Sequence, residues 1–481
     1  MQPENFRFGG GAGQTLLHPL VLAVLLVAVL LIFFLPRKYL VLPLLSCTFL
    51  IPLPQELYIA GVHFFVFRLF VIAFAARMLI AFFSSPDRIF HGRLGRFDML
   101  FLCWAILRAA AVILIFRVGG AVINQAGFLM DAVGGFFVLR YVIADDEDIS
   151  RAVKSLAVIS FVISLFMLYE KTHQTNLFAI LGGVPPEPEV RDALVRAQGP
   201  FQHEILAGTF GATLAPLFFM LWKTGKSTLF AVLGFVAATI ITFASGSSTP
   251  VLAFVAGLAA ICLWPMRRHM RLVRWGIVAG IAALSAVMKA PVWFLIARVG
   301  VVGGSSGYHR AMLVNNFVTR FNDWWLIGTK ENSTWGANMW DLSNQFVAEG
   351  QTGGLATFIC FMALICIAFS RLGRARKAVE GDRQKEWYFW SIGCALFAHI
   401  SAFMGISYFD QVRVLWFLTL VIAVVAAAPY LRAGVRIPAA RSWTPAGIVP
   451  IRRPPSWPVR QSLRSWSFAS RKARGPQGVS S

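Results

Sequence analysis

The sequence predicts an all-α, polytopic integral membrane protein with about 12–13 transmembrane helices. Three observations support this fold class. Of the 481 residues, 57% are hydrophobic and 14% are charged, whereas roughly a quarter of the residues in a soluble globular protein are charged. The mean hydropathy is +0.68. Apolar runs of roughly 17–25 residues recur along the chain, and each is long enough to cross a bilayer as a helix.

Thirteen apolar segments account for the predicted helices. They lie at 16–35, 39–54, 64–83, 98–117, 124–143, 152–169, 204–222, 227–244, 249–264, 273–288, 353–370, 388–405 and 412–431. Segment 39–54 carries Pro43, Pro52 and Pro54, and is the weakest of these predictions because proline interrupts helices. Segment 16–35 is long for a signal-peptide core and lacks a small-residue cleavage site, so we expect no cleaved signal.

Basic residues mark alternate loops and so predict the topology. By the positive-inside rule the basic loops are cytoplasmic. Lys and Arg gather around 37–38, 88–96, 223–226, 267–274 and 371–385. The two long loops, 170–203 and 289–352, then face the outer side. The N-terminus is external only if segment 39–54 crosses the membrane.

The last fifty residues differ from the rest of the chain. Residues 432–481 hold ten Lys or Arg, no Asp or Glu, and seven prolines, and so supply nearly half of the net charge of +22. We expect a polytopic membrane domain at 1–431 and a disordered, basic cytoplasmic tail at 432–481. Such a tail is suited to anionic lipid headgroups. The basic excess therefore does not predict a nucleic-acid partner.

No cofactor is predicted. All six cysteines lie in hydrophobic segments, and the sequence contains neither CxxC nor a Cys/His cluster of the kind that binds zinc. It also contains no Walker sequence and no dinucleotide fingerprint. We therefore expect neither a metal nor a nucleotide.

The end of the first outer loop carries one group of candidate site residues. Arg196, His203 and Glu204 lie immediately before an apolar segment. Glu204 falls at a predicted helix N-terminus, where a carboxylate is electrostatically favoured. Two interpretations stay open: a capped helix start at the membrane interface, or an anion-binding corner with an adjacent proton acceptor.

The second outer loop is longer than most loops in compact proteins, and such loops tend to be functional. His309 and Arg310 follow a glycine-rich turn, and Arg310 opens an amphipathic stretch that suits the membrane interface, with the guanidinium facing a phosphate. A plain interfacial helix is the alternative. Asp341 and Asn344 precede the return to lipid, and Asp341 is a candidate cap of the helix that begins there.

Arg108 lies near the middle of the predicted helix 98–117. A charge within the hydrocarbon core is costly and is normally paired or functional. Arg108 is therefore a third candidate cation.

These motifs together resemble the O-antigen ligase and Wzy-type polysaccharide polymerase superfamily. R-A-Q-G-P-F-Q-H at 196–203 resembles the family's outer-face R-x-x-G-P-F-x-H loop. Arg310 resembles the arginine that opens the late loop. W-W-L-I-G at 324–328 resembles a family turn, and D-L-S-N-Q-F at 341–346 with the following G-G-L resembles the family's loop ending. The resemblance spans roughly 190–431.

Two positions depart from the family pattern. T-F-A-S-G-S-S-T-P at 242–250 resembles a short family turn but lacks its arginine. Ser343 stands where the ligases have a histidine directly before the asparagine of the last motif. The second departure favours a polymerase over a ligase.

The resemblance implies a GT-C-like membrane glycosyltransferase that acts without metal or nucleotide. It would transfer a polyprenyl-diphosphate-linked glycan to a sugar hydroxyl at the outer face of the bacterial inner membrane, as in O-antigen or exopolysaccharide biosynthesis. Cations must hold the diphosphate, and a base must accept the hydroxyl proton. The cationic candidates are Arg196, Arg310 and Arg108, with Asn344 as a further substrate-binding residue. The proton candidates are His309, His203, Glu204 and Asp341.

The implied partners are the polyprenyl-linked oligosaccharide, membrane lipid, and a chain-length regulator and flippase of the same pathway. Three alternatives remain. An O-antigen ligase would use a lipid or protein acceptor. A transporter or lipid flippase would also have many membrane spans and buried arginines, but repeated halves with matched broken helices are expected there, and none is found. A non-catalytic scaffold would not need two outer loops rich in Arg, His and aromatic residues.

Overall fold

A computed structural model describes residues 15–59, 62–84, 94–298 and 307–432. The chain divides into two units, Met1–Ala439 and Ala440–Ser481, and all described residues belong to the first. The predicted tail beyond Arg432 lies outside the described residues, as does most of the glycine-rich turn before Tyr308.

The described part of the chain is helical apart from two short β-hairpins, which confirms the predicted fold class. Within it, eight helices are long and apolar enough to cross a membrane, and three shorter apolar helices accompany them. The protein is thus a multi-pass membrane protein by helix length and hydropathy. Each of the thirteen predicted segments contains a helix. The elements are α2 (Pro19–Phe34), α3 (Val41–Leu50), β1 (Glu56–Ile59), β2 (Val62–Phe65), α4 (Val66–Ser84), α5 (Arg96–Phe116), α6 (Gly119–Leu129), η3 (Met130–Gly134), α7 (Gly135–Val142), α8 (Asp146–His173), β3 (Glu189–Arg191), β4 (Leu194–Arg196), α9 (Glu204–Lys223), α10 (Thr228–Ala244), α11 (Ser248–Cys262), η5 (Trp264–Arg268), α12 (Met270–Val287), η6 (Val292–Arg298), α13 (Gly307–Thr319), α14 (Phe321–Trp324), η7 (Ser333–Trp335), α15 (Gln345–Ala378), α16 (Arg383–Phe403) and α17 (Asp410–Arg432).

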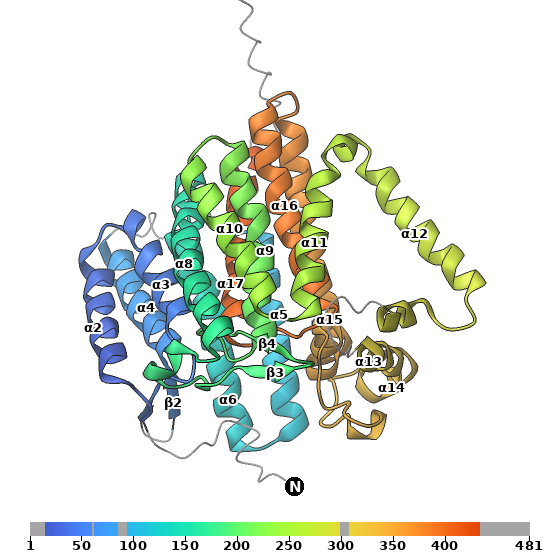
Figure 1. The fold of residues 1–481 in the computed structure, drawn as a ribbon, viewed down its shortest axis with the longest axis horizontal. Coiled ribbons are helices and arrows are strands. Elements are labelled where there is room, and N and C mark those ends of the chain that lie inside the picture. The colour runs from blue at the N-terminus through green and yellow to red at the C-terminus, as the bar shows by residue number, and fades with distance from the viewer. Residues whose placement is uncertain (1–14, 60–61, 85–93, 299–306, 433–481) are drawn as a thin grey trace, which may run out of the picture. The chain divides into compact units, whose positions relative to one another are not determined.

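Helix α9 lies at the centre of the helical bundle and packs against α10, α11 and α16 (Figure 1). Small residues make this close packing possible. A Cβ on Gly208 would lie 2.3 Å from the Ser245 hydroxyl, and one on Gly211 would lie 2.6 Å from the Ala238 carbonyl oxygen. The N-terminus of α9, where the first candidate site begins, is therefore held by a tightly packed helix.

The chain just before α2 and the chain just after α3 lie close together. The chain before α2 pairs with the hairpin after α3, because Leu16 bridges to Glu56 and the His18 amide donates to Gln55 Oε1 at 2.9 Å. Helix α3 has only ten residues, about 15 Å at 1.5 Å per residue. The predicted second span is thus shorter than expected, and the chain after it continues into the β1–β2 hairpin.

Helix α12 differs from the other long apolar helices because none of its residues is buried. Among the described elements, its most extensive contacts are with the flanking turns η5 and η6. Figure 1 shows it apart from the bundle on the α11 side.

The described part of segment 289–352, the second predicted outer loop, packs around a small hydrophobic core. Leu313 of α13 is fully buried, and Phe317 stacks on Trp324 with ring centroids 4.0 Å apart. Helix α13 is therefore more than a plain interfacial helix. Two glycines with positive φ, Gly328 and Gly354, bring the 324–328 turn against a kink in α15; a Cβ on Gly354 would lie 2.6 Å from the Leu326 carbonyl oxygen.

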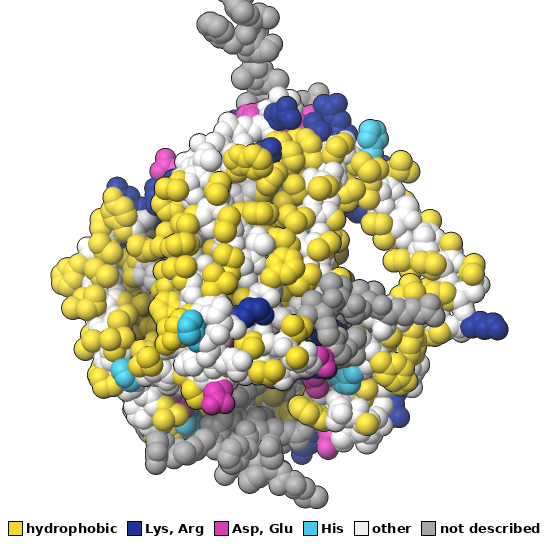
Figure 2. Space-filling model, viewed as in Figure 1, with side chains coloured by type: hydrophobic (Ala, Val, Ile, Leu, Met, Phe, Trp, Pro, Cys, Tyr) yellow, Lys and Arg dark blue, Asp and Glu magenta, His cyan; other side chains and the backbone are white. Residues whose placement is uncertain are grey.

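Charged side chains are unevenly distributed. Figure 2 shows hydrophobic side chains along the flanks of the helices and a concentration of Lys and Arg at the end where α15 and α16 meet. At that end Glu386 is buried between two arginines, 2.8 Å from Arg267 and 3.4 Å from Arg376. The candidate site lies at the other ends of these helices, where α9, α15 and α17 begin.

Candidate functional site

The loop between β4 and α9 is tied to the surrounding helices through its backbone. The amides of Gln198 and Gly199 donate to the two carboxylate oxygens of Glu170 at 2.9 and 2.8 Å. Glu170 belongs to α8 and is fully buried. Asn176 Nδ2 donates to the Gly199 carbonyl at 2.9 Å. Gly199 adopts φ +58°, so the turn favours glycine.

Helix α17 holds the second half of this loop. The Gln202 amide donates to Asp410 Oδ2 at 2.8 Å, and Gln411 Nε2 donates to the Pro200 carbonyl at 3.3 Å. Backbone groups are therefore satisfied by buried side chains on both sides, which fixes the positions of Arg196 and His203 before any ligand binds.

Arg196 lies buried at the start of this loop and is already paired. Its Nη2 lies 2.6 Å from Glu204 Oε1 and donates to Ser247 Oγ at 2.5 Å. Its Nη1 donates to Glu189 Oε2 at 3.1 Å. Glu204 is buried, whereas the Glu189 side chain is 50% exposed. Of the two carboxylate contacts of Arg196, the one with the exposed Glu189 can be exchanged for a ligand without leaving a buried carboxylate unpaired.

His203 caps α9. Its Nδ1 accepts the Ile205 amide hydrogen at 3.2 Å. Burial lowers the pKa of His203, Arg196 lowers it further, and Glu189 and Asp341 oppose these effects. The ring is therefore neutral at neutral pH. The 3.1 Å approach of Nδ1 to Glu204 Oε2 is then not an ion pair. With Nδ1 occupied as acceptor, the proton lies on Nε2, and the ring is suited to donate a hydrogen bond rather than to accept a proton.

Arg310 provides a half-buried guanidinium with no hydrogen bond or ion pair to the residues that the structure describes. Its buried Nε is likewise unsatisfied among them. Burial lowers the pKa of Arg310, the Asp341 carboxylate raises it, and the positive charges of Arg191 and Arg196 lower it. Charged side chains of the two predicted outer loops thus lie within electrostatic range of one another here. Arg310 and Asp341 come from the second loop, and Arg191 and Arg196 from the β3–β4 hairpin of the first.

His309 is oriented by the backbone. Its Nε2 lies 2.9 Å from the Asn338 carbonyl oxygen, so this nitrogen donates and Nδ1 keeps a lone pair. Nδ1 lies 3.5 Å from Ser343 Oγ, at the outer limit of a hydrogen bond. A neutral imidazole with one nitrogen held by a carbonyl is suited to accept a proton at the other nitrogen. Of the two histidines, His309 is therefore the better proton acceptor.

Asn344, not Asp341, caps α15, so the sequence-based expectation for Asp341 is wrong. Asn344 Oδ1 accepts the amides of Phe346 and Val347 at 3.0 and 3.2 Å. Asn344 is buried, and its Nδ2 donates to the Met404 carbonyl. Its polar atoms are thus used within the protein. The exposed Asp341 side chain instead contributes negative charge near His203 and Arg310.

Arg108 belongs to a separate polar group between α5 and α15. Its Nε lies 3.9 Å from Glu349 Oε2, and its guanidinium lies 4.4 Å from the centre of the Phe128 ring. Glu349 also accepts from Trp104 Nε1 at 2.9 Å. None of these partners contacts Arg196 or Arg310, so the structure does not bring Arg108 into their group.

No protein-family model matches the chain, and no curated protein matches it. The chemistry of the site is therefore inferred from the positions of its own residues. Among the described residues, no group of three or more His, Cys, Asp or Glu side chains is placed to hold a metal ion.

Sequence reasoning missed Arg191 and Glu170. Arg191 lies in the first outer loop five residues before Arg196, and the predicted convergence of two loops on an anion was a signal that could have included it. Glu170 sits at the end of a predicted apolar helix, where an acidic residue is ordinary at a membrane interface. No local signal indicates that its carboxylate turns inward.

Proposed function

We propose that this protein is a polysaccharide polymerase of the bacterial inner membrane. It transfers a glycan from a polyprenyl diphosphate to a sugar hydroxyl at the outer face. The observation that carries the proposal is the half-buried Arg310, which has no hydrogen bond or ion pair among the described residues, whose Nε is unsatisfied, and which lies within electrostatic range of Arg191 and Arg196. A half-buried, unsatisfied guanidinium with two further arginines in electrostatic range suits a polyanion, and arginine matches phosphate oxygens through its planar fork.

The surrounding backbone adds to this positive field. Helices α9 and α17 begin at the 197–203 loop, since His203 caps α9 and Asp410 at the start of α17 accepts the Gln202 amide, and α11 begins beside it, since its cap Ser247 accepts from Arg196. Helix N-termini carry partial positive charge and favour anions. A diphosphate leaving group gains negative charge as its bond to the sugar breaks, so fixed positive groups stabilise the transition state more than the bound substrate.

In the proposed reaction, the acceptor hydroxyl oxygen attacks the anomeric carbon of the donor sugar. His309 Nδ1 takes the hydroxyl proton, and the bond between the anomeric carbon and the diphosphate oxygen breaks. The leaving oxygen keeps the electron pair, and Arg310 and Arg191 hold its charge. Arg196 contributes when Glu189 is displaced, and His203 donates from Nε2.

The position of Ser343 supports a polymerase over a ligase. In the family that the sequence resembles, the ligases have a histidine at this position. The reaction itself is a single glycosyl transfer in either case, and the acceptor distinguishes the two.

Arg310→Ala and Arg310→Lys test the proposal, with Arg320→Ala as the matched control. Arg320 is 44% exposed and forms a loose ion pair with Asp323 at 3.8 Å. We expect Arg310→Ala to cost about 3 kcal/mol, or roughly a hundredfold in rate. Lys should restore activity only in part because it lacks the fork. Arg320→Ala should resemble the unmodified protein.

The measurement is polymerisation of a polyprenyl-diphosphate-linked repeat unit by purified protein in lipid nanodiscs, without added nucleotide or metal. Near-normal turnover by Arg310→Ala would remove Arg310 from the site. Absence of transfer by the unmodified protein, with substrate shown to be bound, would refute the enzymatic assignment and favour a flippase.

A further inference from the structure

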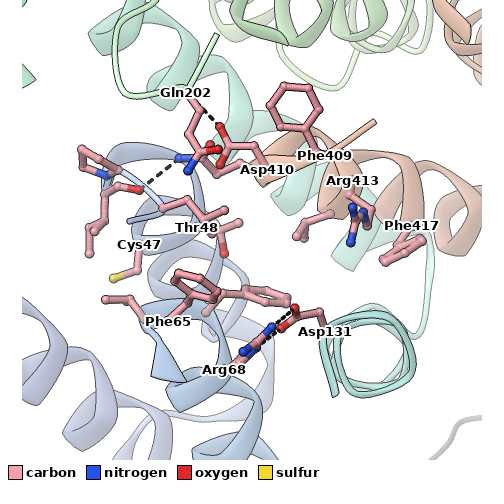
Figure 3. A pocket seen from close by; sticks show the side chains of 17 residues that line it. Cys47, Thr48, Phe65, Arg68, Asp131, Gln202, Phe409, Asp410, Arg413 and Phe417 are labelled. Carbon is pink, nitrogen blue, oxygen red and sulfur yellow. Dashed lines mark hydrogen bonds and ion pairs between the residues drawn. The ribbon is translucent and has the colours of Figure 1, made fainter. Parts of the chain in front are cut away.

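A cavity of about 300 Å³ lies beside the candidate site, on the other side of the 197–203 loop. It is bounded by the C-terminal end of α3, the N-terminal ends of α4 and α17, the segment η3 and Gln202 (Figure 3). None of the residues assigned above to diphosphate binding or proton transfer lines it. Its size is at the lower end of the range for small-molecule sites, and it offers room for one compact ring.

The charges that line this cavity balance. Arg68 and Asp131 form a two-pronged ion pair, with both nitrogen–oxygen distances at 2.9 Å. Asp410 and Arg413 supply one further charge of each sign. Figure 3 shows the Arg68–Asp131 pair on one wall, with Asp410 and Arg413 on the opposite side. The lining holds as many acidic as basic side chains, unlike the arginines and Glu-paired cations of the candidate site, so it offers a phosphate no matched set of free cations.

Two buried acceptors at this cavity have no donor among the described residues. Asp410 Oδ2 accepts the Gln202 amide, but its Oδ1 has no hydrogen-bond partner. Gln411 is 2% exposed, and its Oε1 is likewise unsatisfied. Unsatisfied buried acceptors are costly, and hydroxyl groups of a ligand would satisfy them.

The rest of the lining is aromatic and aliphatic. Phe65, Phe67, Phe409 and Phe417 contribute rings, and Val414 an aliphatic surface. Asp131 lies in a π-helical segment, and such segments recur at functional sites. Aromatic faces beside unsatisfied polar groups match a sugar ring, which has apolar C–H faces and a rim of hydroxyl groups.

We propose that this cavity binds a neutral sugar residue of the acceptor glycan. The assignment to an acceptor rests on the proposed function, whereas sugar binding itself does not. Gln202 lies on the cavity wall and His203 is the next residue. In an extended backbone, consecutive side chains point to opposite sides, and His203 has φ −151° and ψ 140°. Gln202 thus faces the proposed acceptor subsite, and His203, the next residue, faces the opposite side of the loop, where Arg196 lies.

The first experiment measures sugar binding directly. Saturation-transfer NMR would be recorded in lipid nanodiscs, because sugar-headed detergents would compete, with a panel of neutral methyl glycosides and with pyrophosphate. Thr48→Trp fills the cavity, and Asp410→Asn keeps its shape but removes the carboxylate. Leu42→Trp, on the same helix but half-exposed and outside the lining, is the control. We expect glycoside signals to disappear with Thr48→Trp, to weaken at least fivefold with Asp410→Asn, and to persist with Leu42→Trp.

Glycoside signals that survive Thr48→Trp would overturn the proposal, as would pyrophosphate signals that this variant abolishes. The second experiment uses the transfer assay. Thr48→Trp should raise the KM for a free acceptor glycan at least tenfold and leave the KM for the donor unchanged. An unchanged acceptor KM would refute the subsite while the proposed function stands. Cavity-dependent glycoside binding without any transfer would refute the proposed function and the acceptor role, while supporting a sugar site.

Discussion

Replacing Glu170 with glutamine tests whether the buried Glu170 carboxylate anchors the 197–203 loop. The carboxylate accepts two backbone amides, one on each oxygen, and is fully buried. Glutamine has nearly the same shape but only one acceptor oxygen. Its amide nitrogen would then face a backbone N–H, leaving one buried donor without an acceptor. Each such loss costs about 1–3 kcal/mol, so we expect the loop to lose about 2 kcal/mol.

This loss of free energy determines how much faster the loop amides should exchange with solvent. An opening equilibrium shifted by about 2 kcal/mol changes roughly thirtyfold, because 1.36 kcal/mol corresponds to a factor of ten. Hydrogen–deuterium exchange of peptides covering 196–203, measured in nanodiscs, should therefore accelerate by about that factor. The rate of glycosyl transfer should fall with little change in donor KM, because the arginines are displaced relative to the reacting atoms.

Glu147→Gln is the matched control. Glu147 lies on the same helix, its side chain is 80% exposed, and it forms a surface ion pair with Arg151. Such pairs contribute little, so exchange and turnover should stay unchanged. Unaltered exchange at 196–203 in Glu170→Gln would refute the inference that this carboxylate anchors the loop. Faster exchange with normal turnover would show that the loop's rigidity is not needed for transfer.

Three further predictions concern topology, pH and the tail. A cysteine replacing Lys330 should react with a membrane-impermeant reagent in intact spheroplasts, and one replacing Lys226 only after lysis; the reverse pattern would contradict the topology. Folding lowers the pKa of His203 from its ordinary value of about 6.5. The folded protein therefore favours neutral His203, and this contribution to the free energy of unfolding is fully present above about pH 6.5. It is lost as the pH falls through the lowered pKa of the folded state. The thermal midpoint should therefore fall less between pH 7 and pH 5 in His203→Asn, which caps without titrating, and an equal fall in both proteins would exclude His203 as the titrating cap. Truncation at Gly434 should leave polymer formation largely intact, and complete loss at normal protein abundance would disprove this.

The sequence by itself determined the fold class and the positions of the helices. A membrane span is recognised from the length and polarity of one continuous segment, so thirteen apolar segments each produced a helix without knowledge of their neighbours. The same argument placed His309 and Arg310 in a long loop and Glu204 at a helix start. The helix predicted at 39–54 was too long, because apolar residues continue past the end of α3 into the chain before β1.

Only the tertiary structure decided which polar groups meet. Glu349 is 245 positions from Trp104 in sequence, yet the two are hydrogen-bonded beside Arg108. The sequence predicted that Arg108 is paired or functional, but it did not identify Glu349 as the partner. Glu170 and Asp410 likewise acquire their roles from backbone amides of a distant loop. The physical reason is that burial removes water, so each polar group must find its partner wherever the packing of helices brings one. That packing depends on the side chains of all helices together and is not encoded in any one segment.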